Sequence, residues 1–455
     1  MEQVTMTETT LRYDSLVVGL GLTGLSCVRH LVASGERVAA VDSRQQPPGL
    51  QQLQHEFPQV DYQLGPFDAD YLCQARRLIM SPGVALAEPA IVEAQAAGVE
   101  ISSDIDLLCE QVKAPIIAIT GSNAKSTVTA LVGEMAKQAG LRVAVAGNIG
   151  VPVLQLLAQG EFDLYVLELS SFQLEVTHKL AAEVAVILNV SEDHLDRYDS
   201  LAAYRCAKQR IFSGAHQWVN NLDDPQLPGP VANDRRWNYG LGKPATERDY
   251  GLLDLSGEHW LARGQQPLLP VAELRIKGRH NQSNALAALT IAAAAGLDEA
   301  SCLQALKAFS GLPHRCQWVA EKAGVAYYND SKGTNTGATL AALEGLANPE
   351  RASLVLIAGG QGKGADFSVL IPAITAYVHA VVLMGEAAEE MEALFGGLPG
   401  VDSVKVNSMA EAVGAAAALA QPGDIVLLSP ACASFDQFAG YADRGERFVA
   451  EVLSL

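Results

Sequence analysis

Short apolar runs alternate with stretches of helical periodicity along most of this chain. Runs such as 116–119, 354–358 and 425–428 consist of Val, Ile, Leu and Ala, and turns rich in polar residues or glycine follow them. Continuous apolar strands separated by helices are typical of parallel sheets that are buried on both faces. We therefore predict an α/β fold, and the 455 residues suffice for two to four domains.

The segment 116–135 carries the clearest chemical signal. A buried strand leads into the loop 120–127 (TGSNAKST), and a helix with apolar positions at 128, 131, 132 and 135 follows. Such a loop forms a phosphate cradle, in which Lys125 faces the β- and γ-phosphates and Ser126 or Thr127 offers a hydroxyl to Mg²⁺. An ordinary βα turn with a chance lysine would have the same residue types, so that alternative stays open.

This loop differs from the standard phosphate loop in two ways. It is two residues shorter than G-x-x-x-x-G-K-[ST], and Ala124 stands where glycine is usual. Alanine in a left-handed conformation costs about 1–2 kcal/mol. We therefore predict an allowed, negative φ at Ala124.

The N-terminal segment has the pattern of a dinucleotide-binding unit. A strand (16–18) enters the turn Gly19-Leu20-Gly21-Leu22-Thr23-Gly24, and a second strand ends at Asp42. This spacing predicts NAD binding, although the same close approach of backbone to pyrophosphate serves any nucleotide diphosphate. A third strand ends in the tight turn 81–83. We expect Asp104 to cap a short helix, and a boundary at 114–115.

Polar clusters end three strands of the central region. The predicted strands are 142–146, 164–167 and 184–188, and Glu168 and His194 lie in the polar segments that follow. The carboxyl ends of parallel strands gather ligands, so we expect these segments to converge on the phosphate loop and Glu168 and His194 to hold Mg²⁺. Each could instead be a solvated residue at a strand end. Spacing alone does not distinguish Lys208, in the helix 201–212, from a surface lysine.

The later part of the chain offers further candidates. Between 218 and 274 we predict only short strands and turns, without chemistry. Asn281 precedes a long Ala-rich helix and could face a base or ribose, or only cap the helix. Beyond 312, strand ends again carry polar residues, and Arg315, Lys332 and Lys363 suit an acidic substrate.

The composition limits the kinds of partner that this protein can bind. The formal net charge of −19 excludes nucleic acid and anionic membrane as main partners, since both require a basic surface. The seven cysteines are scattered and lack C-x-x-C spacing, which indicates reduced thiols. No signal peptide or membrane-spanning run is present in the printed sequence, and we expect a loose N-terminal arm and a cytoplasmic, monomeric protein.

The motifs in this order resemble the Mur ligases of peptidoglycan synthesis, and within that family the branch that adds D-glutamate. The resemblance covers essentially the whole chain. It rests on 121–127 (GSNAKST), 168–173 (ELSSFQ), 189–198 (NVSEDHLDRY), the helix of Lys208, 312–315 (LPHR), 329–335 (NDSKGTN) and 427–438 (LLSPACASFDQF). It implies three domains: a Rossmann-like domain for UDP (1–103), a central P-loop ATPase-like domain (104–311) and a Rossmann-like domain for the amino acid (312–455).

The resemblance also implies a reaction and its substrates. ATP would phosphorylate the alanine carboxylate of UDP-N-acetylmuramoyl-L-alanine, and the amine of D-glutamate would displace phosphate from the acyl phosphate. Lys208 matches a lysine that CO₂ carbamylates, which turns a cation into an oxygen ligand suited to Mg²⁺. A hinge near 311–313 would let the C-terminal domain rotate before chemistry.

The site residues that the resemblance implies fall into five groups. The catalytic residues would be Lys125, His194, Lys208 and Lys332. ATP would bind to Gly121, Ser122, Asn123, Ala124, Lys125, Ser126, Thr127, Asn281, Arg315 and Asp330. The UDP substrate would bind to Leu22, Thr23, Gly24, Asp42, Ser43, Arg44, Ser81, Pro82, Gly83, Asn148 and His194. D-glutamate would bind to Thr334, Lys363, Ser434, Phe435 and Tyr441. Two Mg²⁺ ions would be held by Ser126, Glu168, His194 and carbamylated Lys208.

Three positions depart from the family pattern, and three other functions stay open. Ala124 replaces a glycine, Gly333 stands where alanine is usual, and Gln361 stands where aspartate is usual, which leaves the role of that acid in doubt. A nicotinamide-dependent oxidoreductase would explain only residues 19–42. A folylpolyglutamate-synthetase-like ligase would share the acyl-phosphate chemistry but not the N-terminal glycine turn. A nucleotide-binding scaffold would bind ATP without releasing phosphate.

Overall fold

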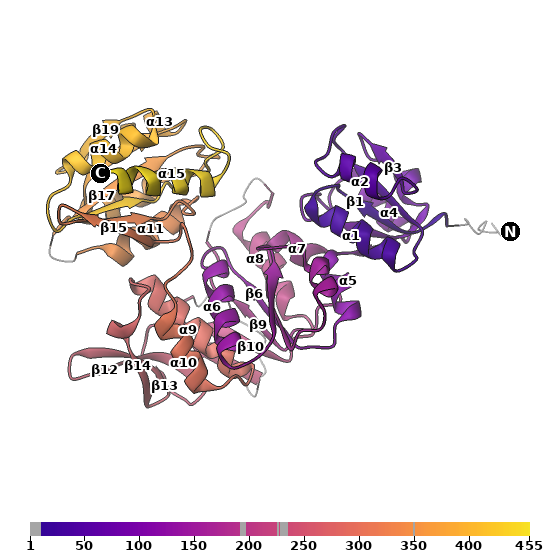
Figure 1. Ribbon diagram of the computed structural model, residues 1–455, viewed down its shortest axis with the longest axis horizontal. Helices are drawn as coiled ribbons and strands as arrows, with labels where there is room; N and C mark the ends of the chain where they lie inside the picture. Colours follow the sequence, from indigo (N-terminus) through magenta and orange to yellow (C-terminus); the bar gives the residue numbers. More distant parts are fainter. Residues whose placement is uncertain (1–10, 192–196, 225–226, 228–234, 349–350) are drawn as a thin grey trace.

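A computed structural model describes residues 11–191, 197–224, 227, 235–348 and 351–455. These residues form three α/β domains, each built on its own sheet. The N-terminal and C-terminal domains stand on either side of the central one (Figure 1). None of the helices within the described ranges has both the length and the apolar character needed to span a lipid bilayer.

The N-terminal domain is a five-stranded parallel sheet in the order β3-β2-β1-β4-β5. Its central strand is buried on both faces, as the continuous apolar run requires. The sequence predictions of strands at 16–18 and 78–80 are confirmed. The elements are β1 (Tyr13–Val18), α1 (Leu22–Ala33), β2 (Val38–Asp42), α2 (Leu50–Glu56), β3 (Asp61–Leu64), α3 (Ala69–Leu72), β4 (Ala75–Met80), α4 (Pro89–Ala96) and β5 (Glu100–Ser102).

The central domain has a nine-stranded sheet in the order β14-β13-β12-β11-β10-β9-β6-β8-β7. The strands from β7 to β12 are parallel, and two antiparallel strands complete the far edge. The strands are β6 (Ile116–Thr120), β7 (Val143–Gly147), β8 (Leu164–Glu168), β9 (Val184–Ile187), β10 (Gln217–Asn221), β11 (Arg236–Tyr239), β12 (Asp249–Leu255), β13 (Glu258–Arg263) and β14 (Gln266–Pro270). The helices are α6 (Lys125–Gln138), η1 (Val153–Gln159), α7 (Ser171–Val176), α8 (Leu201–Gln209), η2 (Arg210–Phe212), η4 (Val271–Glu273), α9 (Arg279–Ala294) and α10 (Glu299–Ala308).

Helix α6 lies on this sheet as its sequence predicts. Val128, Leu131, Val132 and Met135 are fully buried, and they share one core with Ile117 and Ile119 of β6 and with α9. The helical spacing of four apolar residues therefore fixes the face that α6 presents to β6.

The C-terminal domain is a six-stranded sheet in the order β15-β16-β20-β17-β18-β19, parallel except for β15. Alternate residues of its middle strand enter two separate cores, one on each face, because helices cover both sides. The strands are β15 (Gln317–Lys322), β16 (Val325–Asn329), β17 (Leu354–Gly359), β18 (Val378–Met384), β19 (Asp402–Lys405) and β20 (Ile425–Leu428). The helices are α11 (Thr336–Leu346), η5 (Phe367–Leu370), α12 (Ile371–Tyr377), α13 (Ala388–Phe395), α14 (Met409–Leu419) and α15 (Tyr441–Ser454).

Helix α5 (Asp104–Gln111) connects the first two domains, and its cap differs from the expected one. Ser103, not Asp104, is the N-cap: its hydroxyl accepts the N–H of Asp106, and the Asp106 carboxylate accepts the N–H of Ser103. Asp104 is the first residue of the helix itself. The side chain of the residue before it, Ser103, is the one that can reach the free N–H groups of the first turn.

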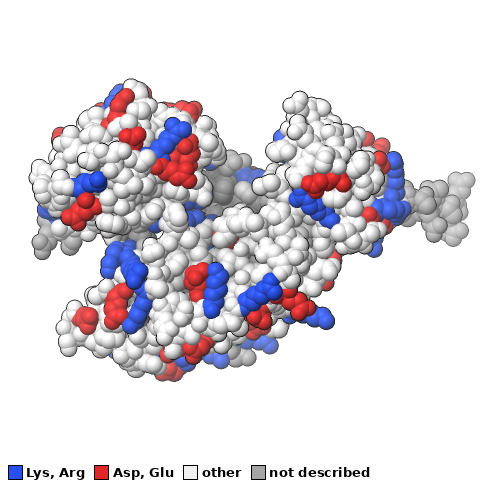
Figure 2. All heavy atoms as spheres, in the orientation of Figure 1, with Lys and Arg blue, Asp and Glu red and all other residues white. Residues whose placement is uncertain are grey.

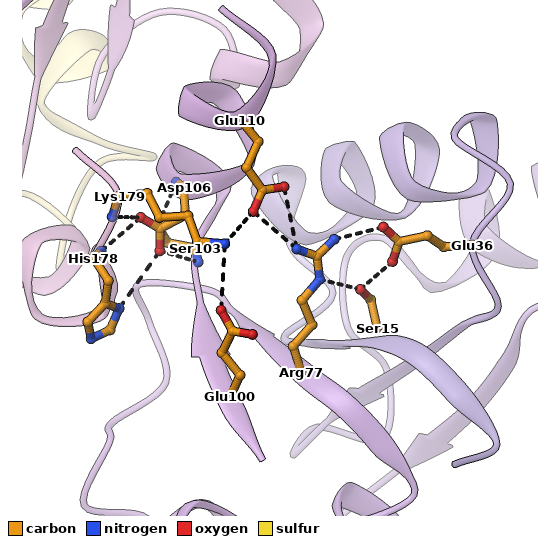
Figure 3. A network of polar contacts seen from close by, with 9 residues as sticks. All are labelled: Ser15, Glu36, Arg77, Glu100, Ser103, Asp106, Glu110, His178 and Lys179. Atoms are coloured by element: carbon orange, nitrogen blue, oxygen red, sulfur yellow. Dashed lines mark hydrogen bonds and ion pairs between the residues drawn. The ribbon is translucent and has the colours of Figure 1, made fainter. Parts of the chain in front are cut away.

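A polar network ties α5 to both neighbouring domains (Figure 3). The buried guanidinium of Arg77 on β4 pairs with Glu36 at 2.7 Å and with Glu110 of α5 at 3.3 Å. One turn earlier on the same helix, Asp106 accepts the backbone N–H groups of residues 178 and 179 at 2.8 and 2.7 Å. A buried charge pair of this kind is costly to break, so the network favours one orientation of the N-terminal domain on the central one.

Candidate active site

The loop between β6 and α6 has the backbone path of a phosphate cradle, but the prediction for Ala124 was wrong. Ala124 has φ 64°, in the left-handed region, and its carbonyl accepts the N–H of Val128 at 3.0 Å as the first bond of the helix. Because the loop is two residues shorter than the standard form, the reversal into α6 falls on Ala124 itself. The N–H groups at the start of α6 are thereby left facing the loop, where an anion binds.

The end of β9 supports this loop. The backbone N–H of Ser122 donates to the Asn189 carbonyl at 2.9 Å, and the N–H of Asn123 donates to Asn189 Oδ1 at 2.8 Å. Lys125 lies over the loop, with Nζ 2.7 Å from the carbonyl oxygen of Gly121. Two neighbouring strands therefore hold the cradle rigidly, with its lysine at the centre.

The polar ends of the central strands converge here, as predicted. Asn148, after β7, donates to Glu168 Oε1 at 2.9 Å. Glu168 ends β8 and is 1% exposed, and its Oε2 has no hydrogen-bond partner among the described residues. A buried carboxylate oxygen without a donor suits a hard cation such as Mg²⁺, and Ser126 at the start of α6 offers a hydroxyl oxygen of the same chemical type. The residues present therefore fit Mg²⁺.

Lys208 belongs to this centre and not to the surface. It is 1% exposed, its Nζ donates to the Gly121 carbonyl at 2.9 Å, and the same atom lies 4.5 Å from the ring centroid of Tyr204. Tyr204 lies one turn earlier on α8 and is also buried. The helical spacing of the two residues was visible in the sequence, but which face of α8 is buried depends on the domain around it.

His194 lies outside the described residues. Within the described ranges no group of three or more His, Cys, Asp or Glu side chains is arranged to hold a metal ion.

Two residues of the C-terminal domain reach the phosphate loop. Arg315 Nη2 donates to Ser126 Oγ at 2.6 Å, and Asn335 Nδ2 lies 3.5 Å from Asn123 Oδ1. Burial lowers the pKa of Arg315. Asn335 is also the N-cap of α11, whose first turn therefore starts beside the loop.

A small cavity adjoins this contact. It has a volume of about 60 Å³, and its lining includes Thr127 of α6, Asn281 of α9, Arg315 and Trp318. Asn281 Nδ2 donates to the Lys277 carbonyl at 2.8 Å, so Asn281 takes part in local hydrogen bonding and also lines the cavity. Asn281 lies inside α9, whose N-cap is Gly278 without a side-chain hydrogen bond, so the interpretation of Asn281 as a helix cap is wrong. Contact with a base or ribose stays a prediction.

The loop after β16 contains an unusual carboxyl group. Burial raises the pKa of Asp330 to about 7, while its Oδ2 accepts the hydroxyl of Ser429 at 2.7 Å and its Oδ1 accepts the N–H of Cys316 at 3.1 Å. A Cβ at Gly333 would lie 2.6 Å from Asp330 Oδ2, so glycine at this position leaves room for the carboxyl group. Lys332 Nζ lies 4.1 Å from the ring centroid of Tyr441.

The residues expected to bind an acidic substrate lie on adjoining loops of the C-terminal domain. Gln361 and Ala433 exchange two backbone hydrogen bonds at 2.9 and 3.0 Å, which pairs the loop of Lys363 with that of Ser434. Lys363 is exposed, Ser434 is buried, and Phe435 is 68% exposed. The N–H of Thr334 bonds to the carbonyl of Lys332, which keeps the third loop tightly turned.

The glycine turn of the N-terminal domain has the predicted form. A Cβ at Gly24 would lie 1.8 Å from the Gly19 carbonyl oxygen, so only glycine fits where α1 packs on the turn. Leu22 at the start of α1 is 77% exposed, Thr23 beside it is half-buried, and Ser43 is exposed.

Asp42 at the end of β2 and the 81–83 turn lie beside the glycine turn and belong to the same candidate site for the UDP substrate. Burial opposes the ionisation of Asp42, but hydrogen bonds from Arg44 and from the Leu20 N–H outweigh it, so the pKa of Asp42 lies below its ordinary value. Ser81, followed by Pro82 and Gly83, starts the predicted turn and donates to the Gly19 carbonyl at 3.1 Å. Asp42 thus organises the glycine turn and holds Arg44 at its rim.

Sequence reasoning missed Arg444, the largest fully buried side chain among the residues that the structure describes. It lies on α15 in register with Phe448 and Val452, both fully buried, at positions i, i+4 and i+8. That apolar stripe was the signal that could have placed Arg444 against the core.

A P-loop domain between two Rossmann-like domains, with a cation from one of them on the P-loop serine, is the architecture of a class of ATP-using ligases. The chain belongs to the Mur ligase family. Family models match along its length: "Mur ligase MurD-like, N-terminal domain" at residues 13–103, "Mur ligase middle domain" at 119–292, and "Mur ligase, glutamate ligase domain" at 314–432.

Individual relatives agree with this assignment. The chain is 54% identical over 442 residues to a Pseudomonas aeruginosa protein named UDP-N-acetylmuramoylalanine--D-glutamate ligase, covering 97% of this chain and 98% of that protein. It is 52% identical over 444 residues to the protein of the same name from Nitrosococcus oceani, with 97% of each covered.

Solved structures share the fold. MurF ligase from Thermotoga maritima, in complex with ADP, has a TM-score of 0.60 at 16% identity, covering 99% of this chain and 100% of that chain. UDP-N-acetylmuramate-alanine ligase MurC from Thermotoga maritima has a TM-score of 0.59 at 20% identity, covering 97% and 99%.

Proposed function

We propose that this protein is an ATP-dependent ligase that joins D-glutamate to UDP-N-acetylmuramoyl-L-alanine in peptidoglycan precursor synthesis. The observation that carries the proposal is the contact of Arg315 with Ser126, which brings a cation of the C-terminal domain onto the phosphate loop of the central domain. The choice of substrates is supported by the names of relatives that are more than half identical over nearly the whole chain.

The reaction requires activation because a carboxylate is a poor electrophile. The γ-phosphoryl group of ATP moves to an oxygen of the alanine carboxylate, and ADP leaves. The amine of D-glutamate then attacks the acyl carbon and loses a proton, and phosphate leaves with the C–O bonding electrons. Such transfers depend on charge neutralisation and alignment, which Lys125, Arg315 and Lys332 would supply.

The nucleotide would bind across the phosphate loop, with its base and ribose toward Asn281 and Asp330. The cavity lined by Thr127, Asn281 and Arg315 supports this direction. Mg²⁺, when bound, would neutralise phosphate charge. Its holders would be Ser126, Glu168, His194 and Lys208, the last as a carbamate formed from its amine and CO₂ with loss of a proton.

The UDP part of the substrate would lie on the glycine turn and the 81–83 turn of the N-terminal domain. Arg44 would face its phosphates from the rim, where Asp42 holds it. Asn148 and His194 would contact the alanine end, and the hydrogen bond of Asn148 to Glu168 supports this position near the transferring phosphate.

D-glutamate would be held through its carboxylates by Thr334, Lys363 and Ser434, beside Phe435 and Tyr441. His194 would orient or deprotonate the amine. A rotation of the C-terminal domain about residues 311–313 would close the site. Figure 2 supports such a motion, because a hollow separates the two outer domains above the central one. Domain limits at 103 and 311, a monomeric state and a cytoplasmic location stay predictions.

The decisive experiment measures phosphate release from ATP in the presence of UDP-N-acetylmuramoyl-L-alanine and D-glutamate, with L-glutamate as the control. We expect release to require both substrates and the D-enantiomer. Release without the UDP substrate, or no release with both substrates, would contradict the proposed function.

A further inference from the structure

Arg444 is buried without a carboxylate partner among the described residues. Its guanidinium instead donates to three backbone carbonyls and one hydroxyl. The acceptors are Ser331 O at 2.7 Å, Ser331 Oγ at 3.0 Å, Cys432 O at 3.1 Å and Ala433 O at 3.3 Å. Burial lowers the pKa of Arg444 to about 10, so the side chain stays charged at neutral pH.

A buried charge costs free energy, and among the described residues no ion pair with Arg444 offsets that cost, although the charges of Asp436 and Asp330 reduce it. The five N–H groups of a guanidinium point in fixed directions within one plane, so its hydrogen bonds fix the positions of their acceptors. The acceptors of Arg444 belong to two loops that are about a hundred residues apart in the sequence, and the side chain therefore joins these loops.

Each of the two loops carries candidate site residues next to the contact. Ser331 directly precedes Lys332, and Ala433 directly precedes Ser434. The first loop also bonds to the second through its own backbone, because the Ala431 N–H donates to the Gly333 carbonyl at 2.9 Å.

The next residue of α15 supports a third segment. A Cβ at Gly445 would lie 2.2 Å from His314 Nδ1, and the Gly445 carbonyl accepts Asn329 Nδ2 at 3.2 Å. His314 directly precedes Arg315. The start of α15 therefore packs against the segments that carry Arg315, Lys332 and Ser434.

The backbone of these segments needs such support. Seven described residues other than glycine have positive φ, and five of them lie in the loops of the candidate site. These five are Ala124, His314, Cys316, Lys363 and Ala431. Residues in this conformation persist only where the surrounding structure holds them.

We propose that Arg444 is a positioning residue that sets the distance between the loop of Lys332, which faces the nucleotide, and the loop of Ser434, which faces the incoming amino acid. This inference rests on the proposed function and deepens it. Arg444 would not touch substrate; it would determine whether the acyl phosphate and the amine meet.

The test compares Arg444→Lys with Arg447→Lys. Lysine keeps the charge but cannot span both loops with a planar fork, whereas Arg447 lies on the same helix, is exposed and pairs with Asp443. For Arg444→Lys we expect KM for D-glutamate to rise about tenfold or more and kcat to fall about a hundredfold, with KM for the UDP substrate within twofold of wild type. Arg447→Lys should leave all three unchanged.

A second readout does not depend on activity. Hydrogen exchange of residues 330–334 and 431–435 should accelerate together in Arg444→Lys, while residues 121–124 keep the wild-type rate. If both loops keep wild-type exchange, or if kcat falls only with the folded fraction while KM for D-glutamate stays constant, the inference is overturned. An inactive wild-type protein would refute the proposed function, and exchange would still decide whether Arg444 holds the two loops.

Discussion

The guanidinium of Arg315 and the hydroxyl of Ser126 are joined by a hydrogen bond of 2.6 Å that crosses from the C-terminal to the central domain. Arg315 is half-buried there, and the Glu168 carboxylate opposes the lowering of its pKa by burial. The contact thus sets a fixed positive charge beside a phosphate-binding loop. This arrangement suits the neutralisation of charge that develops on a transferring phosphoryl group.

Arg315→Ala should therefore lower kcat for phosphate release by about 100-fold or more. The measurement is steady-state release with all three substrates saturating. Arg76→Ala, which removes an exposed arginine of the N-terminal domain, is the matched control. A kcat within twofold of wild type for Arg315→Ala would remove Arg315 from the proposed machinery.

Lys208→Ala should lose activity to a similar extent, about 100-fold, because a carbamate at this buried position would supply oxygen ligands that alanine lacks. Short carboxylic acids added to the assay should restore part of the activity by supplying the missing oxygens. Lys137→Ala, at an exposed lysine paired with Glu134, serves as the control. Full activity of Lys208→Ala would refute the carbamate assignment.

Ala124→Gly should stabilise the protein. Glycine removes about 1–2 kcal/mol of strain from the left-handed backbone of the folded state. It also lowers the free energy of unfolding by about 0.4–1 kcal/mol, because glycine gives the unfolded chain more conformational freedom. We therefore expect a net increase of about 0.5–1 kcal/mol in the free energy of unfolding. Thermal unfolding measures it as a higher Tm. Ala139→Gly, at the C-cap of α6 where φ is −75°, should lower Tm.

Much of the fold was predictable because its signals are local. The apolar run of β6 and the spacing of Val128 to Met135 predict the strand and the helix from residues that are close in the sequence. The convergence of Asn148 and Glu168 also followed, since parallel neighbouring strands end at one edge of the sheet.

What could not be predicted depends on contacts between distant segments. The conformation of Ala124 is set by how a shortened loop meets β9, and the burial of Lys208 by which face of α8 packs inward. Arg444 was missed because arginine in a helix is usually solvated, although its register with Phe448 was visible.

Arg44→Ala should raise the apparent KM for UDP-N-acetylmuramoyl-L-alanine by about tenfold, and KM for ATP by less than twofold, because a charge-assisted bond to phosphate contributes about 1.5–3 kcal/mol. Asp42 holds Arg44 at 2.7 Å beside the glycine turn, far along the chain from the phosphate loop. Arg37→Ala, which removes a surface arginine paired with Asp14, is the control. A larger effect on ATP than on the UDP substrate would move the uridine site elsewhere.

Asp330 predicts a pH dependence of stability. Its folded-state pKa is raised to about 7 from an ordinary value of 3.8, so the folded protein binds this proton more tightly than the unfolded chain does. The contribution of Asp330 to the free energy of unfolding is therefore largest below about pH 4 and is lost as pH rises toward about 7.

Asp330→Asn should abolish that slope. The amide oxygen can still accept the Cys316 N–H, and the Ser429 hydroxyl can rotate to accept from the amide nitrogen. Relative to wild type, the free energy of unfolding of the variant should increase between pH 4 and 7 by an amount on the order of a few kcal/mol, and above pH 7 the difference should stay constant.

Chemical denaturation at each pH measures the difference, and Asp402→Asn, at an exposed strand position, is the control. A variant whose stability relative to wild type falls as pH rises would contradict the raised pKa. If the variant is more stable than wild type at pH 8 but releases phosphate more slowly, then the buried carboxyl group of Asp330 lowers the stability of the protein and increases the rate of the reaction.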